Sequence, residues 1–195
     1  MNGQLAFQTT YSLEDFVAVH FGQSAFNGHV VIGASKKDNA SIYRFRSISA
    51  SALQDEIGSL RFKNMDYYIT ANSFSGLDRK KENLFALHNI VIDIDHHGQT
   101  FSAIEHYNKT EKLIRCIHEQ MGIYQPNTVV KTGRGLQLWY AIESAHQSLE
   151  QRYMQLTDML IDQINNIILQ DTELYAYFGC VDAAPCRNTA GFFRL

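Results

Sequence analysis

Cysteine, proline and long apolar runs are all scarce in this chain. Its 195 residues include three cysteines and two prolines. Cys116, Cys180 and Cys186 are too few and too irregularly spaced for a disulfide framework, and they form no close pair of the kind that structural zinc sites use. No apolar run approaches the roughly 20 residues of a membrane helix, and no basic leader followed by an apolar stretch opens the chain. We therefore expect a cytoplasmic protein without a membrane partner.

The residues that are abundant favour a globular protein. Apolar residues make up 45% of the chain and aromatic residues 12%, which is enough for a sizeable core. The net charge of −3 is unevenly distributed, because residues 36–81 contain nine basic and five acidic residues, a balance of +4 that leaves −7 for the rest. Such a basic segment is compatible with an anionic partner, although a solvated basic face is the commoner cause of so small an excess.

Hydrophobic periodicity divides the chain into two parts. In residues 1–86 we expect a helix that begins at Ser12 and strands over 29–34, 41–47 and 65–72. The expected later elements are a strand over 91–95, a helix over 102–121, a hairpin of 127–132 and 136–142, a helix over 149–169, and two short strands within 177–195 around a turn at Ala184 and Pro185. This is the order of a ferredoxin-like sheet. The predicted fold is therefore α+β, with an RRM-like (ferredoxin-like) unit of residues 87–195 fused to an N-terminal α/β unit of residues 1–86.

The run VIDID, residues 91–95, places two carboxylates in an apolar strand. Because side chains at positions i and i+2 of a strand point to the same face, Asp93 and Asp95 should project together while Ile92 and Ile94 pack on the other face. Two carboxylates so close repel each other, and a divalent cation such as Mg²⁺ or Mn²⁺ would stabilise both. The alternative is that one acid faces solvent at the strand's end and the other caps the following helix.

Two further features lie downstream. The stretch Lys131-Thr-Gly-Arg-Gly-Leu-Gln137 crosses the expected hairpin, where glycines allow a tight turn that offers N–H groups to an anion, and Lys131 and Arg134 add positive charge. Asp182 ends a later apolar run, and a third carboxylate would complete a two-metal site of the kind used in phosphoryl transfer. Alone, each of these two features is more often part of an ordinary turn that binds nothing.

Taken in this order on this strand pattern, the three features resemble the archaeo-eukaryotic primase superfamily, in the branch found on plasmids, phages and integrative elements. That family carries a strand-borne Asp-x-Asp, a Ser-Gly-x-Gly-x-His-like hairpin, an Asp on a later strand and a basic residue beyond it. The matching positions here are Asp93 and Asp95, the hairpin 132–137, Asp182 and Arg194. The resemblance covers the chain from about Tyr67 onward. Because the last strand of similar proteins continues into a helical domain, we expect a catalytic fragment of a longer replication protein.

The resemblance implies a DNA primase or primase-polymerase, a template-dependent nucleotidyltransferase that makes or extends primers in the replication of a mobile element. Its partners would be single-stranded DNA, nucleoside triphosphates and a helicase domain or subunit. Two Mg²⁺ or Mn²⁺ ions would be held by Asp93, Asp95 and Asp182. The triphosphate would be bound by Lys131, Thr132, Arg134, Gly135, Gln137 and Arg194. The template would follow Arg61, Lys63, Arg79, Lys80 and Lys81, with Tyr67, Tyr68 and Phe74 stacking on its bases.

The chain departs from the family pattern within the hairpin. Gln137 stands where the family has a histidine that contacts phosphates, and Thr132 replaces the serine. Glutamine can donate a hydrogen bond but carries no charge, so triphosphate binding should depend more on Lys131, Arg134 and Arg194.

Other interpretations stay open at this point. The departure at the hairpin gives some support to a catalytically weak replication-initiator or single-strand-binding module on the same fold. A haloacid-dehalogenase-like phosphatase is disfavoured, because its Asp-x-Asp would stand near the start of the domain. His96 and His97 are lesser candidates as additional metal ligands, since residues just past a strand are usually exposed.

Overall fold

The structure, a computed structural model, describes residues 12–22, 28–36, 44–49, 52–58, 65–76, 78–96, 102–132 and 135–194, and at residues 36, 44–46, 54, 57, 58 and 123 it describes the backbone alone. Eight strands form one sheet in the order β6-β7-β5-β4-β1-β3-β8, with β2 paired to β1. Each of these pairings is antiparallel. The strands are β1 (His29–Lys36), β2 (Arg44–Ser49), β3 (Met65–Thr70), β4 (Ser73–Phe74), β5 (Leu84–Asp95), β6 (Thr128–Lys131), β7 (Gly135–His146) and β8 (Phe192–Arg194).

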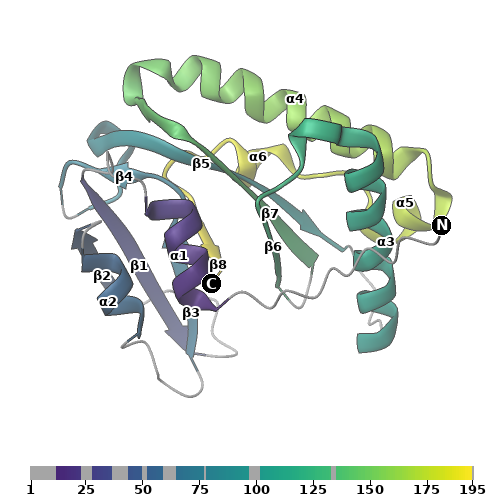
Figure 1. The fold of residues 1–195 in the computed structure, drawn as a ribbon, viewed down its shortest axis with the longest axis horizontal. Coiled ribbons are helices and arrows are strands. Elements are labelled where there is room, and N and C mark those ends of the chain that lie inside the picture. The colour runs from purple at the N-terminus through teal and green to yellow at the C-terminus, as the bar shows by residue number, and fades with distance from the viewer. Residues whose placement is uncertain are drawn as a thin grey trace.

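Helices cover both faces of the sheet (Figure 1). They are α1 (Leu13–Phe21), α2 (Leu53–Gly58), α3 (Ala103–Met121), α4 (Glu150–Leu169), α5 (Thr172–Phe178) and α6 (Ala183–Cys186), with short 3-10 segments η2 (Lys81–Asn83), η3 (Gly122–Tyr124) and η4 (Gln147–Leu149). Helices α1 and α2 pack on one face, and α3 to α6 pack on the other. In the described ranges no helix is both long and apolar enough to span a bilayer.

Sequence patterns account for where the main helices begin and what they bury. Ser12 and Asp15 form a capping box at the start of α1, which confirms the predicted helix start. Ser102 caps α3 by accepting a hydrogen bond from the Glu105 amide at 3.2 Å. Leu113 and Ile117 of α3 are buried at a four-residue spacing, so this helix presents one apolar stripe to the sheet.

The two faces of β5 enter two different cores. Ile90, Ile92 and Ile94 belong to the larger core, under α3 and α4, whereas Val91 belongs to the smaller core beneath α1. A strand covered on both faces is expected to be apolar throughout, so its polar residues need partners or a function.

The polar residues in the first half of β5 have partners. His88 lies between the hydroxyls of Ser73 and Ser144, with Nε2 and Nδ1 each 2.9 Å from an oxygen. Asn89 donates its amide protons to the carbonyls of His20 and Ala71, so its Oδ1 is left to accept a hydrogen bond from His20 Nδ1 at 2.7 Å. These contacts fix the central strand against its neighbours, and they leave the acids at its far end as the polar residues to be explained.

The last strand, β8, contacts the β6-β7 hairpin at the other end of the sheet. Phe193 of β8 packs edge-on against Trp139 of β7, with ring centroids 5.7 Å apart. Arg194 donates a hydrogen bond of 2.8 Å to the Thr132 carbonyl, just past the end of β6. The sheet is therefore bent so that its last strand returns to the β6-β7 hairpin.

Two expectations about the C-terminal part need correction. The first of the two short strands predicted within 177–195 is wrong, because α5 runs to Phe178 and Asp182 then caps α6 by accepting a hydrogen bond from the Ala184 amide at 2.9 Å. Second, a ferredoxin-like sheet places its last strand beside its first, whereas β8 pairs with β3 and β5 lies between β7 and β4. The mixed α+β class is confirmed, and the RRM-like arrangement is not.

The buried histidines predict how stability depends on pH. Burial lowers the pKa of His20 and of His88 to about 4. Because the unfolded chain takes up these protons near pH 6.5 and the folded chain only near pH 4, the free energy of unfolding should fall as the pH drops through this window. The loss is roughly 3 kcal/mol for each histidine. Urea unfolding of wild type and His20→Gln between pH 4 and 8 measures it. The variant should show the shallower pH slope, and equal slopes would contradict the assignment.

Candidate functional site

The candidate site lies where the end of β5 pairs with the start of β7. Asp93 is paired with Gln137 and Asp95 with Gly135, across the β5-β7 ladder. Ile92 and Ile94 are fully buried in the core on the opposite face of β5, as the alternation of side chains predicts. Asp93 is partly buried and Asp95 is exposed, so the two acids lead from the interior to the surface on one face.

Gly135 lets the hairpin approach β5 closely. A Cβ at this position would lie 2.9 Å from the Cα of Asp95 and would overlap the Ile94 carbonyl. Only glycine leaves room for this backbone contact. The glycine predicted to be part of an anion-binding turn therefore has a packing role beside Asp95.

Asp93 lies where its charge is unfavourable. Burial, and next the neighbouring Asp95 carboxylate, raise the pKa of Asp93 to about 6, while a hydrogen bond from the Gln137 side chain and the charge of Arg194 act in the opposite direction. Asp182 also raises this pKa. Four of the residues that the sequence predicts as one site are thus close enough to act on the Asp93 carboxyl group, namely Asp95, Gln137, Asp182 and Arg194.

At Asp93, the edge of β5 that does not pair with β7 is covered by α6. The Asp93 amide donates a hydrogen bond to Cys186 Sγ at 3.3 Å, and the Cys186 thiol donates to the Asp182 carbonyl at 3.1 Å. Because the Asp93 amide points away from β7, Asp93 and Gln137 form a non-hydrogen-bonded pair, the kind in which facing side chains are closer. Burial raises the pKa of Cys186 to about 12, so this thiol is a packing and hydrogen-bonding group and not a nucleophile.

Arg194 joins three segments that are distant in sequence. Besides the Thr132 carbonyl, its guanidinium contacts the Tyr68 hydroxyl at 3.3 Å and the Asp66 carboxylate at 3.7 Å. The hydrogen bond with Tyr68 raises the pKa of Arg194. Arg194 is partly buried, with 36% of its side chain exposed, so part of it remains accessible to solvent.

Lys131 points away from the acids. It pairs with Leu136, whose side chain enters the larger core, so Lys131 lies on the α3 side of the hairpin. There its Nζ forms a 3.0 Å ion pair with Glu111 and lies 4.2 Å from the centre of the Tyr107 ring. The structure therefore separates Lys131 from Asp93, Gln137 and Arg194, although it was predicted to bind the same triphosphate.

The predicted template residues are divided among other contacts. Arg79 donates a hydrogen bond of 2.7 Å to the Ala190 carbonyl and lies over the Phe192 ring, which gives it a structural role beside β8. Lys80 and Lys81 keep about two thirds of their side chains exposed, and they form ion pairs with Asp78 and Glu150. Of the predicted basic stretch, these two lysines are the described residues with their charges at the surface.

The aromatic residues expected to stack on bases differ in accessibility. Phe74 is fully buried in the larger core, so this prediction is wrong for Phe74. Tyr67 packs against the smaller core, and Tyr68 is partly buried beside Arg194. The predicted Arg61, Lys63, His97 and Arg134 lie outside the described residues.

The oxygen donors around Asp93 suit a hard cation but do not form a complete ligand set of acids. Within the part of the chain that the structure describes, no three His, Cys, Asp or Glu side chains are close enough together to hold a metal ion. One Asp182 oxygen is used to cap α6. His96 packs instead against the rings of His106 and Tyr177, with centroids 5.7 and 5.5 Å away. The carboxylates of Asp93 and Asp95 are therefore the main oxygen donors at this end of β5.

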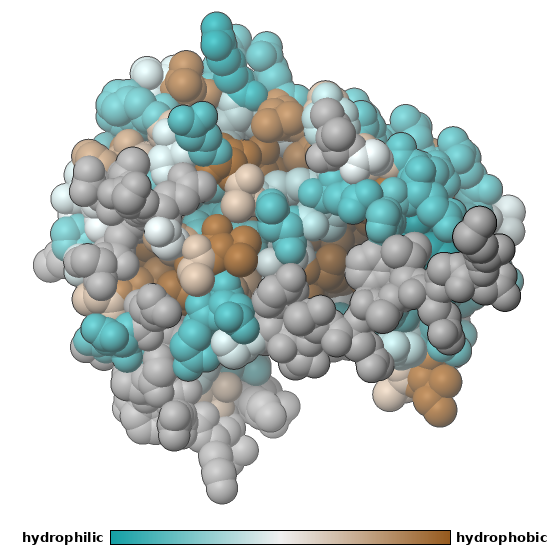
Figure 2. Space-filling model, viewed as in Figure 1, coloured by the Kyte–Doolittle hydropathy of each residue, from teal (hydrophilic) through white to brown (hydrophobic). Residues whose placement is uncertain are grey.

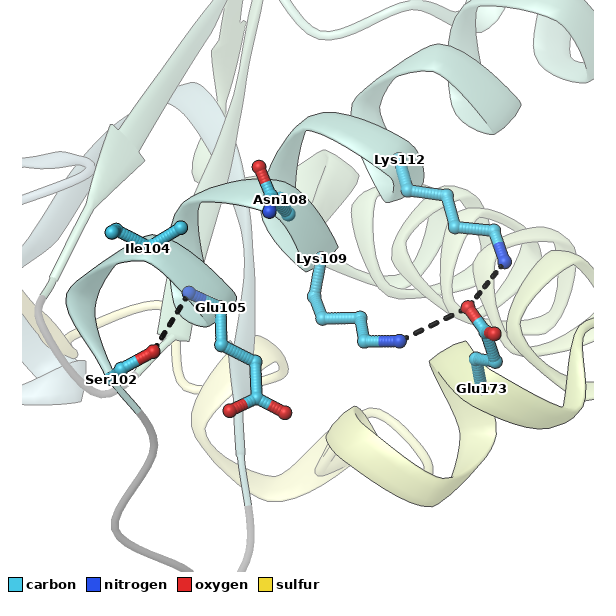
Figure 3. A pocket seen from close by; sticks show the side chains of 7 residues that line it. All are labelled: Ser102, Ile104, Glu105, Asn108, Lys109, Lys112 and Glu173. Carbon is cyan, nitrogen blue, oxygen red and sulfur yellow. Dashed lines mark hydrogen bonds and ion pairs between the residues drawn. The ribbon is translucent and has the colours of Figure 1, made fainter.

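A separate hollow of about 370 Å³ lies between α3 and α5 (Figure 3). Lys109 and Lys112 both point to Glu173 there, each at 3.0 Å. None of the predicted site residues lines it. This glutamate is bound by both lysines, and the hollow lies on the helical side of the molecule, whose surface is largely hydrophilic in Figure 2.

Several residues of the site were not found from the sequence. Glu111 and Tyr107 hold Lys131, and Asp66 holds Arg194. Cys186 was interpreted as a packing residue, and its contact with the Asp93 amide was missed. The spacing of four between Asp182 and Cys186 is a helical signal that could have indicated a capped turn instead of a strand.

Comparison of the chain with protein-family models, with curated proteins and with solved structures finds no match.

The raised pKa of Asp93 predicts that this acid weakens the fold. A raised folded-state pKa contributes stability at low pH that is lost as the pH rises through about 6. At pH 8 without divalent cations, Asp93→Asn should therefore increase the free energy of unfolding, by up to about 3 kcal/mol. Asp95→Asn removes only the neighbouring charge and should give a smaller gain. Urea unfolding measures both variants, and an Asp93→Asn protein that is less stable than wild type would show that the buried charge is compensated.

Proposed function

We propose that the chain is a metal-dependent nucleotidyltransferase that makes or extends primers on single-stranded DNA, as the resemblance to archaeo-eukaryotic primases implies. The observation that carries the proposal is the pair Asp93 and Asp95 on one face of β5, opposite Gln137 and within electrostatic range of Arg194. Two adjacent acids that destabilise the fold are explained by a task that requires them, because burying them without one only costs stability.

Each described residue has a role that fits its environment. Asp93 and Asp95 would hold Mg²⁺ or Mn²⁺, with the free oxygen of Asp182 on the side of α6. Bound cation would supply the Lewis acid that polarises the α-phosphate and favours a nucleophilic primer hydroxyl. Arg194, fixed by Tyr68 and Thr132, would orient the triphosphate through its accessible guanidinium edge.

In this reaction the 3′-hydroxyl of a primer or an initiating nucleotide attacks the α-phosphate and pyrophosphate leaves. The residues of the site chiefly position the reactants and balance charge, as is general for phosphoryl transfer. Lys80 and Lys81 would contact the template backbone from the exposed loop before β5.

The alternative function, a single-strand-binding or replication-initiator module with weak catalysis, is favoured by one observation. Lys131 is bound to Glu111 and Tyr107 on the other side of the hairpin, so one of the cations predicted for triphosphate binding is engaged elsewhere. A module of this kind needs the basic surface but not the acids.

Primer synthesis tests the proposed reaction. On single-stranded DNA with labelled ribo- and deoxyribonucleotides, the wild type should form products with Mg²⁺ or Mn²⁺ and none with EDTA. Asp93→Asn and Asp95→Asn should each lower the rate at least about 100-fold, because each weakens the binding of the cation that stabilises the negative charge of the transition state. Asp162→Asn, which changes an exposed acid on α4, is the control and should keep the wild-type rate. Product formation by the Asp93→Asn, Asp95→Asn double variant at the wild-type rate would refute the proposal.

Binding of a labelled oligonucleotide separates the two functions. Fluorescence anisotropy of single-stranded DNA should show weaker binding for Lys80→Ala and Lys81→Ala, with a smaller salt slope for each, because each removes a phosphate contact. The nucleotidyltransferase should bind nucleoside triphosphate only when Mg²⁺ or Mn²⁺ is present. Tight metal-independent binding of the oligonucleotide, together with no nucleotide incorporation, would instead establish the binding module.

A further inference from the structure

Arg194 carries a positive charge close to two carboxylates but pairs with neither. Its charge lowers the pKa of Asp93, and the Asp95 carboxylate raises the pKa of Arg194, so the three groups lie within electrostatic range. An arginine and a carboxylate at close range usually form a hydrogen-bonded ion pair, because that geometry suits both groups. In the part of the chain that the structure describes, however, Arg194 forms its ion pair with Asp66 and none with Asp93 or Asp95. The contacts of Arg194 therefore keep these opposite charges apart.

Strand β3 supplies two side chains that hold the guanidinium. Tyr68 lies directly opposite Arg194 in the β3-β8 ladder, and Asp66, two residues earlier, projects from the same face of β3. Arg194 Nη2 donates a hydrogen bond of 3.3 Å to the Tyr68 hydroxyl and lies 3.7 Å from the Asp66 carboxylate. The Tyr68 ring adds a further contact, since the guanidinium carbon lies 5.7 Å from its centre. We call Asp66 and Tyr68 the β3 clamp.

The β3 clamp is not needed to hold β8 in the sheet. Phe193, the residue before Arg194, is buried in the smaller core with 4% of its surface exposed, and it packs against the Trp139 ring. A buried aromatic side chain and the backbone ladder already fix this short strand. Because ordering a long arginine side chain costs conformational entropy, its contacts with the clamp require another explanation.

The nearby acids provide that explanation. Without the clamp, the guanidinium would be free to turn toward them. An ion pair between Arg194 and Asp95 would neutralise a carboxylate that a cation needs as a ligand, and it would occupy N–H donors that a triphosphate needs. An arginine that lies near the two acids but is held by a third one leaves both kinds of group available.

We propose that the β3 clamp holds the guanidinium away from Asp93 and Asp95, and thereby keeps these two acids available for a divalent cation. Asp66 and Tyr68 are thus positioning residues that act through Arg194. The identity of the ligand, a divalent cation, rests on the proposed function, but the test does not require nucleotide incorporation. Tyr68 was expected from the sequence to stack on template bases, and the clamp gives it a different role.

Titration with Mn²⁺ in the absence of nucleotide and DNA tests the proposal, by calorimetry and by the electron paramagnetic resonance signal of free Mn²⁺. The Asp66→Asn, Tyr68→Phe double variant keeps the size of both side chains and removes the charge and the hydroxyl. Its Mn²⁺ affinity should be roughly fivefold lower than that of the wild type, because Arg194 then competes with the cation for the acids. Asp158→Asn is the matched control, since it breaks another arginine–aspartate pair, with Arg187, and it should bind Mn²⁺ as the wild type does.

A third substitution separates positioning from a purely structural role. Adding Arg194→Met to the double variant removes the competing charge and should restore Mn²⁺ affinity to the wild-type value or above it. If the clamp only stabilised the sheet, this substitution would leave binding low or weaken it further. Thermal unfolding of each variant checks that the fold is retained. Asp66→Asn alone keeps the test valid if the double variant does not fold, with a smaller loss that Arg194→Met again restores.

The outcomes separate the inference from the proposed function. Equal Mn²⁺ affinity in the wild type and the double variant, a loss that Arg194→Met does not restore, or no Mn²⁺ binding by the wild type would each overturn the inference. Primer synthesis by a protein whose Mn²⁺ affinity does not depend on the clamp would overturn the inference and leave the proposed function intact. Loss and restoration of Mn²⁺ binding, in a protein that incorporates no nucleotide, would support the inference and refute the proposed function.

Discussion

The burial of Asp93 in a sheet covered on both faces is the constraint on which the rest of the site depends. A carboxylate there is disfavoured by burial and by Asp95, and the surrounding residues respond to that charge. Gln137 lies opposite Asp93 on the neighbouring strand β7, and Gln137 and Arg194 of β8 both lower the pKa of Asp93. The compensation is incomplete, because the pKa of Asp93 is still raised to about 6. An acid in this state is disfavoured as a carboxylate, and a cation bound beside it would stabilise the charged form.

The bend of the sheet makes this arrangement possible. In strand order β8 is as far from β6 as the sheet allows, yet Arg194 reaches the hairpin that follows β6 and Phe193 packs on Trp139. The return of β8 brings the C-terminal part of the chain beside the acids of β5. The short helix α6 also lies beside these acids, on the edge of β5 that does not pair with β7. There Cys186 Sγ accepts a hydrogen bond from the Asp93 amide. The site is therefore assembled from segments that are close in space only because the sheet curls.

The sequence was informative where local physical rules decide the structure. Capping residues and apolar spacing located α1, α3 and α4, and strand alternation placed Asp93 and Asp95 on the same face, opposite Ile92 and Ile94. It was less informative where tertiary contacts decide. The pairing of β8 with β3 depends on contacts between distant segments, and the same residue types were compatible with a ferredoxin-like order.

The sequence also could not predict which way a side chain points at or after a turn. Lys131 could have pointed to either side of the hairpin, and the partner that selects its side, Glu111, lies on a helix 20 residues earlier. Asp182 could have ended a strand or capped a helix, and the apolar run before it favoured the wrong choice. Gln137 shows the same limit, since only the structure reveals that its side chain is buried opposite Asp93.

Anomalous diffraction from crystals grown with Mn²⁺ and a non-hydrolysable nucleoside triphosphate tests the central claim most directly, because it locates the ion independently of any activity. The account predicts a manganese peak at the end of β5 with Asp93 and Asp95 as ligands, and with the triphosphate bound on the same side, near Arg194. A structure with the triphosphate bound elsewhere, or with no manganese beside Asp93, would contradict it.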